Sequence, residues 1–170
     1  ASYIDARANQ GRWLVRMEDL DPPREPPGAA AQILKQLTQL CLVWDGEVLY
    51  QSQRLENYAQ ALQELQNSDL CFHCDCTRSK IKASGPIYDG TCRHRTPPPA
   101  HGYAVRIKTR NTLIEFEDLV QGVYGQNLGT EIGDFVILRK DKLFAYQLAV
   151  VVDDEYQGIT HVVRGFDLLD

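Results

Sequence analysis

The sequence lacks long hydrophobic runs, internal repeats and low-complexity segments. Its longest uncharged apolar run covers residues 143–152, about half of what a membrane-spanning helix needs. Hydrophobic residues make up 44% of the 170 residues and charged residues 24%, as in ordinary globular proteins. These features exclude a collagen, a disordered chain and a disulfide-stapled miniprotein. No basic-then-apolar leader is present, so we expect a cytoplasmic protein with no membrane partner.

Basic residues are fewer than acidic ones, and the net charge of −5 argues against indiscriminate nucleic-acid binding. The charge is unevenly distributed. Residues 71–110 contain eight basic and two acidic residues, a net +6, whereas the remainder of the chain has a net −11. Such asymmetry is typical of a surface that faces a polyanion. A solvated basic loop is the alternative.

Four of the five cysteines lie within 22 residues, at Cys71, Cys74, Cys76 and Cys92. Without a secretory leader, this clustering favours metal binding over a disulfide framework. The close pair Cys74 and Cys76 with the distant Cys92 can close a loop around a structural zinc ion, which needs a fourth ligand.

General rules nominate His73 or His94 for that ligand, and tyrosinate is a rarer choice. Three reduced thiols without metal are the alternative to a zinc site. Cys41 lies in an apolar helical pattern, so we predict that it is a core residue.

The apolar spacing predicts helices and strands in alternation. Helices are expected before Gly11, over residues 28–42 and after Ser52. Strands are expected over residues 12–17, 103–108, 114–124 and 159–163, and a hairpin joins residues 135–138 and 143–146. Residues 147–154 fit either a helix or a strand. The pattern predicts an α/β protein with an insertion, divided into residues 1–70, 71–134 and 135–170.

Two polar constellations follow predicted strands, where α/β sheets bind ligands. Residues 18–21 form an acidic turn that can hold an ammonium group or a sugar hydroxyl; a solvated acidic turn is the alternative. Arg164 follows an apolar strand and suits a carboxylate or a phosphate. An internal salt bridge is the alternative for this arginine.

Residues 12–25, 50–54 and 158–165 resemble segments of class I glutamyl-tRNA synthetases. Two details are similar to their truncated paralogue family, the glutamyl-Q tRNA(Asp) synthetases. One is Pro22-Pro23 after the acidic turn. The other is the pair Cys74 and Cys76 followed by Tyr88 and Cys92. The resemblance covers essentially the whole chain.

This resemblance implies an incomplete Rossmann-type class I aminoacyl-tRNA synthetase catalytic domain with an inserted zinc-bearing α+β segment. It implies a ligase that forms glutamyl-adenylate from L-glutamate and ATP, with Mg²⁺, and transfers glutamate to the queuosine base of tRNA(Asp). Glu18 would bind the ammonium of glutamate, and Tyr146 and Arg164 would complete its pocket. One structural Zn²⁺ would be held by Cys74, Cys76, Tyr88 and Cys92, with Tyr88 assigned on the resemblance alone. We expect a monomer.

The family's ATP-binding motif and an arginine for glutamate would precede Ala1, and its Lys-Met-Ser-Lys-like loop would follow Asp170. We therefore expect a piece of a longer protein with no catalytic residue inside it. Because those elements stabilise the charge that develops during adenylate formation, the 170-residue chain should be inactive by itself. Two alternatives are the core of an ordinary glutamyl-tRNA synthetase and a non-catalytic zinc-containing tRNA-binding module.

Overall fold

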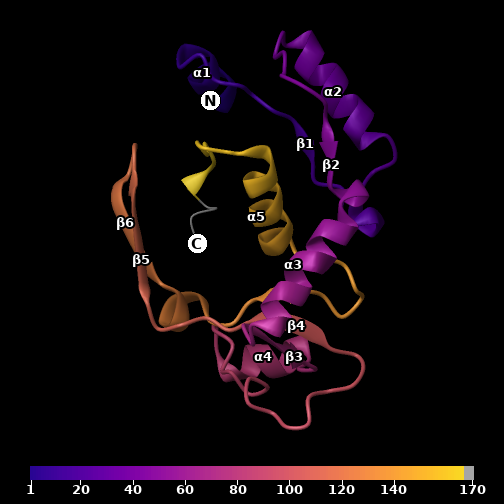
Figure 1. Ribbon diagram of the computed structural model, residues 1–170, viewed down its shortest axis with the longest axis vertical. Helices are drawn as coiled ribbons and strands as arrows, with labels where there is room; N and C mark the ends of the chain where they lie inside the picture. The colour runs from indigo at the N-terminus through magenta and orange to yellow at the C-terminus, as the bar shows by residue number, and fades with distance from the viewer. Residues whose placement is uncertain (167–170) are drawn as a thin grey trace. The chain divides into compact units, whose positions relative to one another are not determined.

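The computed structural model describes residues 1–166 and divides them into two compact units (Figure 1). The first unit comprises Ala1–Tyr58 together with the chain from Ala149 onward, and the second comprises Ala59–Leu148. Helices α3 (Leu55–Asn67) and α5 (Tyr146–Gln157) each contain residues of both units.

The first unit contains a small parallel sheet and several helical segments. Its elements are α1 (Ser2–Ala8), β1 (Arg16–Met17), the turn η1 (Pro22–Arg24), α2 (Ala29–Gln39), β2 (Leu49–Tyr50) and the turn η2 (Gln51–Gln53). Strand β1 pairs in parallel with β2, with Arg16 opposite Leu49 and Met17 opposite Tyr50. Parallel pairing needs a crossover connection, which α2 provides here.

Helix α2 follows a proline pair and begins with three alanines, which favour helix more than any other residue. It ends just before Cys41, whose φ of 57° is left-handed and whose N–H donates to the Thr38 carbonyl. A left-handed residue at this point ends the helix and turns the chain away from the helical path. Cys41 is exposed, so the prediction of a core cysteine is wrong.

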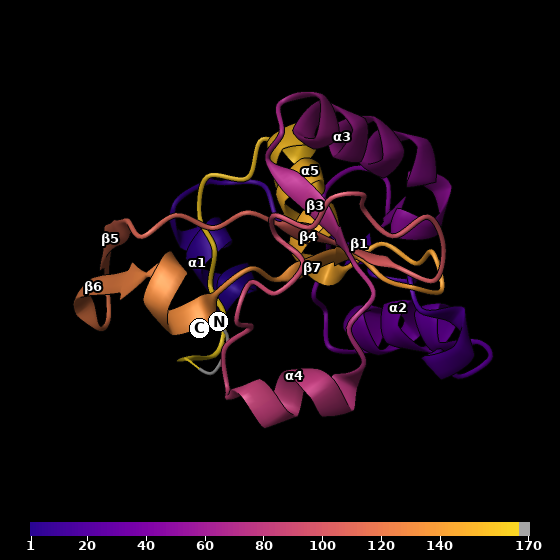
Figure 2. The same ribbon diagram turned by 90° about the horizontal axis from the view of Figure 1, so that it is seen from below.

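The second unit contains an antiparallel sheet, a separate hairpin and two short helical segments. Its elements are β3 (Cys71–Cys74), α4 (Arg78–Ser84), β4 (Ala104–Ile107), β5 (Leu113–Asp118), β6 (Gly122–Asn127), the turn η3 (Leu128–Ile132) and β7 (Val136–Leu138). The sheet has the order β3-β4-β7, and β5 pairs only with β6 within the described residues (Figure 2). Val105 on β4 and Ile137 on β7 are almost fully buried and form part of the core.

The mixture of helices with parallel and antiparallel strands confirms the α/β prediction, but several elements differ in extent. Strand 12–17 shortens to Arg16–Met17, and residues 114–124 form most of a hairpin rather than one strand. Residues 147–154 lie in α5, which settles that ambiguity as helix. The hairpin after residue 135 is reduced to β7 and an isolated bridge between Leu138 and Phe144.

The predicted strand over residues 159–163 is wrong. These residues have an irregular backbone, and no strand among the described residues pairs with them. Their β-branched side chains favour extended backbone, but a strand forms only where a neighbour completes its hydrogen bonds.

Candidate functional site

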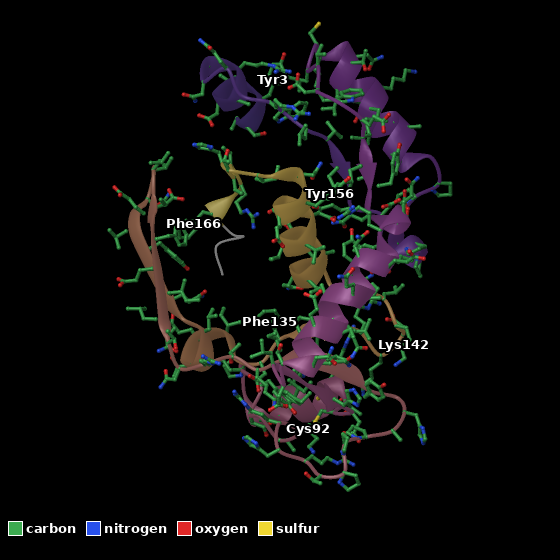
Figure 3. All side chains as sticks on the ribbon, in the orientation of Figure 1. Tyr3, Cys92, Phe135, Lys142, Tyr156 and Phe166 are labelled. Atoms are coloured by element: carbon green, nitrogen blue, oxygen red, sulfur yellow. The ribbon has the colours of Figure 1, made fainter. Side chains whose placement is uncertain are left out.

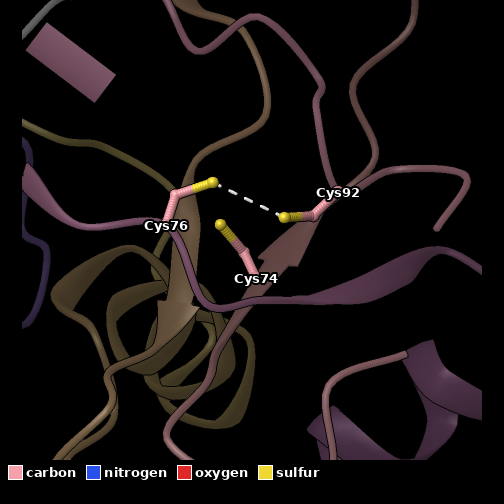
Figure 4. A group of neighbouring side chains, drawn as sticks. All are labelled: Cys74, Cys76 and Cys92. Atoms are coloured by element: carbon pink, nitrogen blue, oxygen red, sulfur yellow. Dashed lines mark hydrogen bonds between the residues drawn. The ribbon is translucent and has the colours of Figure 1, made fainter. Parts of the chain in front are cut away.

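Three cysteine thiols converge in the second unit. Cys74 ends β3, Cys76 lies two residues further on, and Cys92 lies in the turn that follows Gly90. Their sulfur atoms all lie within 4.8 Å of one another, and Cys76 Sγ is 3.5 Å from Cys92 Sγ (Figure 4). All three side chains are buried and none forms a disulfide. The structure therefore brings together the three cysteines chosen from the sequence.

The Tyr88 hydroxyl lies beside this group of thiols. Its oxygen lies 3.5 Å from Cys74 Sγ and 3.9 Å from Cys76 Sγ, and it accepts the backbone N–H of Cys92 at 2.8 Å. In a tetrahedral zinc site, two sulfur ligands lie about 3.8 Å apart, and a sulfur and an oxygen lie about 3.5 Å apart. The observed spacings fit such a site, so the donor set suits a closed, structural zinc ion.

Neither His73 nor His94 has a ring nitrogen in the group of converging ligand atoms found among the described residues. The ring of His73 stacks on Tyr103 with 3.8 Å between the ring centres, and its Nδ1 lies 3.4 Å from the Pro99 carbonyl oxygen. His94 is exposed. The sequence could not rank a tyrosine above a histidine, because general ligand preferences favour imidazole.

The protonation of the group depends on burial and on mutual contacts. Burial, and then the neighbouring Cys92 thiol, raises the pKa of Cys76 to about 11. Burial also raises the pKa of Tyr88, with a further contribution from Cys74. Burial alone would raise the pKa of Cys74, but its contacts with Tyr88 and Arg106 outweigh this effect. The pKa of Cys74 is therefore lowered. Metal binding would have to displace protons from these groups, which makes it dependent on pH.

Arg106 supplies positive charge beside this group. Its guanidinium lies over the Tyr88 ring, 4.1 Å from the ring centre, and its Nη1 donates to the backbone oxygen of Asp134 at 2.6 Å. Three thiolates and a phenolate around a divalent cation leave a net negative charge, which an adjacent guanidinium offsets.

The acidic turn after β1 contains carboxylates with different roles. Asp19 accepts the backbone N–H of Ser52 at 2.8 Å and its hydroxyl at 2.6 Å, so it fixes η2. Ser52 therefore binds the acidic turn through both its backbone and its side chain. Glu18 Oε1 lies 3.5 Å from Arg16 Nε, and 41% of the Glu18 side chain is exposed. Of these two carboxylates, Glu18 is the one accessible to a ligand.

Arg16 connects this turn to α5. Its Nη2 is 2.8 Å from Asp154 Oδ1, and its Nη1 donates to Gln157 Oε1 at 2.8 Å. Its Nε is buried and has no hydrogen-bond partner within the part of the chain that the structure describes. The guanidinium thus holds a fixed position next to the Glu18 carboxylate.

The other two residues assigned to the glutamate pocket, Tyr146 and Arg164, belong to different units. Tyr146 is the first residue of α5, belongs to the second unit and is 41% exposed. Arg164 lies in the exposed irregular segment that follows α5, in the first unit. The pocket formed by Glu18, Tyr146 and Arg164 stays a prediction.

Helix α5 contains a buried carboxylate to which the sequence assigned no role. Asp153 is fully buried and accepts hydrogen bonds from Gln51 Nε2 at 2.9 Å, Arg54 Nε at 2.7 Å and the Tyr58 hydroxyl at 2.7 Å. Arg54 in turn lies over the ring of Tyr156, which is labelled on α5 in Figure 3. This network joins residues 50–54 to α5 within the first unit.

The basic segment has two kinds of cation. Four have partners inside the second unit: Arg93 and Arg106 at Asp134, Arg95 at Asp75, and Lys108 at Asp69. The other four are exposed: Arg78, Lys80, Lys82 and Arg110. Internal pairing therefore accounts for half of the cations, and a surface that faces a polyanion stays a prediction for the four exposed ones. Among residues 1–166, no helix has the length and apolar character that crossing a membrane requires.

The whole chain, residues 1–170, matches the family described as the catalytic domain of class I tRNA synthetases of the E and Q type. The chain belongs to this family. The resemblance noted in the sequence is thus confirmed, and so is the fold class, because the family's domain combines helices and strands as observed here. Members of the family are ligases of the aminoacyl-tRNA synthetase type.

Relatives of this class I domain include proteins named glutamyl-Q tRNA(Asp) synthetase. The one from Pseudomonas entomophila is 52% identical over 170 residues, which are 100% of this chain and 57% of the relative. The one from Escherichia coli K12 is 52% identical over 171 residues, which are 99% of this chain and 54% of the relative. The chain therefore spans little more than half the length of these relatives.

The fold is similar to that of solved glutamate-tRNA ligases. One from Elizabethkingia meningosepticum, crystallised in complex with its amino acid, superposes with a TM-score of 0.82 at 25% identity, over 98% of this chain and 39% of the other. A second, from Elizabethkingia anophelis, gives the same TM-score. These class I domains thus have the arrangement described above.

Proposed function

We propose that the protein containing this chain activates L-glutamate with ATP, as glutamyl-adenylate, and transfers it to the queuosine base of tRNA(Asp). The observation that carries this proposal is 52% identity over the full chain to relatives named glutamyl-Q tRNA(Asp) synthetase. Pro22-Pro23 and the group of three cysteines with Tyr88 agree with it. The partners are glutamate, ATP with Mg²⁺ and tRNA(Asp), and the location is the cytoplasm.

In this proposal the ammonium group of glutamate binds at Glu18. The carboxylate is accessible, and its Oε1 lies 3.5 Å from the Nε of Arg16, whose guanidinium is anchored on α5. An accessible carboxylate can bind an ammonium through a charge-assisted hydrogen bond, which is stronger than a neutral one. Arg164 would pair with a carboxylate of the substrate, and Tyr146 would complete the pocket.

One structural zinc ion belongs to the same proposal, held by Cys74, Cys76, Tyr88 and Cys92. The spacing of the four donor atoms and their burial support it. A closed four-ligand site leaves no position open for a substrate, so the ion would stabilise residues 71–134 and take no part in the reaction.

An ordinary glutamyl-tRNA synthetase is the second candidate, favoured by the similarity to solved glutamate-tRNA ligases. Glutamate-dependent ATP–pyrophosphate exchange by the intact protein, with and without tRNA, separates the two. The glutamyl-Q tRNA(Asp) synthetases resembled here activate glutamate without tRNA, whereas their glutamyl-tRNA synthetase relatives need it. Exchange that occurs only with tRNA would therefore contradict the proposal. The 170-residue chain by itself should show no exchange.

A further inference from the structure

Helix α4 is a seven-residue helix with three cations and no acidic residue. Arg78, Lys80 and Lys82 are all exposed, and no residue of α4 is buried. Arg78 and Lys82 are four positions apart and so are neighbours on one face, where like charges destabilise a helix. The helix thus keeps a repulsive pair of charges at its surface.

Neighbouring groups neutralise this helix only in part. Asp89, whose carboxylate is bound mainly by Thr91, interacts with Lys80. Arg78 and Lys82 remain as an exposed pair on a protein whose net charge outside residues 71–110 is −11. Most cations around α4 have internal partners, as described for Arg93 and Arg106, so the charge on α4 is not needed to balance buried acids.

The candidate zinc ligands Cys74, Cys76, Tyr88 and Cys92, called the metal group below, lie next to both ends of α4 in the sequence. The helix lies between Cys76 and Tyr88, and both residues belong to that group. Its Ile81 packs against the buried cluster formed by Phe72, Cys74, Cys76, Tyr88 and Cys92. The helix has no buried residue of its own, so its position depends on the cluster from which it extends.

We propose that α4 binds the phosphate backbone of the RNA substrate through Arg78 and Lys82, and that the metal group positions it for this contact. An exposed pair of cations on an otherwise acidic protein is complementary to a polyphosphate chain. The contact is independent of base sequence, because phosphates carry no sequence information. This inference rests on the proposed function for the identity of the RNA, tRNA(Asp).

The test compares tRNA binding by the intact, zinc-loaded protein and by its R78Q/K82Q variant at several salt concentrations. Each phosphate contact adds about 0.7–0.9 to the slope of log affinity against log salt. The variant should lose about 1.6 from this slope. When salt is raised from 50 to 200 mM, the wild type should therefore lose affinity by a factor about ten times larger than the factor by which the variant does. Circular dichroism and zinc content should match the wild type, which excludes misfolding.

Two controls separate a phosphate contact from a general charge effect. The charge-conserving R78K/K82R variant should retain the wild-type slope. Lys35→Gln removes an exposed cation from helix α2 and should also leave the slope unchanged. A wild-type slope in R78Q/K82Q, or an equal change in Lys35→Gln, would overturn the inference.

Metal removal provides a second readout. Chelation of the wild type should lower tRNA affinity to about that of R78Q/K82Q, and chelation of R78Q/K82Q should lower it little further. An equal loss in both proteins would show that the metal acts elsewhere. Exchange without tRNA tests glutamate activation separately, so a failure of the proposed function can be told apart from a failure of this inference.

Discussion

Replacing Asp153 tests whether its buried network holds the first unit together. The carboxylate is fully buried and accepts from Gln51, from Tyr58 and from Arg54, whose side chain is 12% exposed. Removing one partner of a buried ion pair costs about 3–5 kcal/mol. Unsatisfied buried donors cost about 1–3 kcal/mol each, although these terms overlap because they share one site. We therefore expect Asp153→Ala to lower the free energy of unfolding by about 4 kcal/mol.

This loss is a large fraction of the roughly 5–15 kcal/mol that stabilises a typical domain. Both tryptophans, Trp13 and Trp44, lie in the first unit, so their fluorescence reports its unfolding in urea. Glu155→Gln is the matched control, because it lies on the same helix and is exposed. It should change the free energy by less than about 0.5 kcal/mol. A loss below about 1 kcal/mol in Asp153→Ala would refute the reasoning.

Three further predictions concern the metal group, the acidic turn and the N-terminal helix. Cys92→Ser should lose the one zinc ion per chain that metal analysis should find in the wild type. Glu18→Gln should raise the glutamate KM about 10–150-fold, because a hydrogen bond to a charged group is worth about 1.5–3 kcal/mol. The pKa of Asp45 is lowered by the backbone N–H of Trp13 and by Arg7. Its contribution to stability is full above the unfolded value of about 3.9 and should be lost as pH falls further.

Each of these predictions has its own control. Cys41→Ser should keep the zinc, since this thiol is exposed and lies in the first unit; a folded, zinc-free wild type would contradict the metal assignment. An unchanged glutamate KM in Glu18→Gln would remove Glu18 from the pocket. For Asp45, Trp13 fluorescence should change in the wild type as the pH falls below about 4, and much less in Asp45→Asn. Equal changes in both would show that another group titrates.

The sequence predicted those features that depend on local spacing. Helix α2 and the helix after Ser52 follow from apolar periodicity. In the second of these helices Tyr58 is fully buried, although the apolar Leu55 at its start is 48% exposed. The convergence of Cys74, Cys76 and Cys92 follows from a close pair and a loop long enough to return to it. Such features need little knowledge of the rest of the molecule.

The features that the sequence missed depend on partners far away along the chain. Asp153 is bound by donors 95 to 102 positions earlier, and no local pattern marks a carboxylate as buried when its partners are remote. The apolar run at residues 159–163 looked like a strand because propensity describes one residue at a time. Whether a neighbouring strand exists to accept its hydrogen bonds is decided by the fold.

The amide hydrogens of the β5–β6 hairpin should exchange with solvent faster than those in the rest of the second unit. Its two strands pair over six residues, yet Leu119 and Val120 at its turn are 91% and 87% exposed, and Phe116 within β5 is 45% exposed. Among the described residues no third strand pairs with this hairpin, and a two-stranded ladder is marginal in water. It can open without disturbing the β3-β4-β7 core, so its amides should exchange by local opening, well ahead of those of β4.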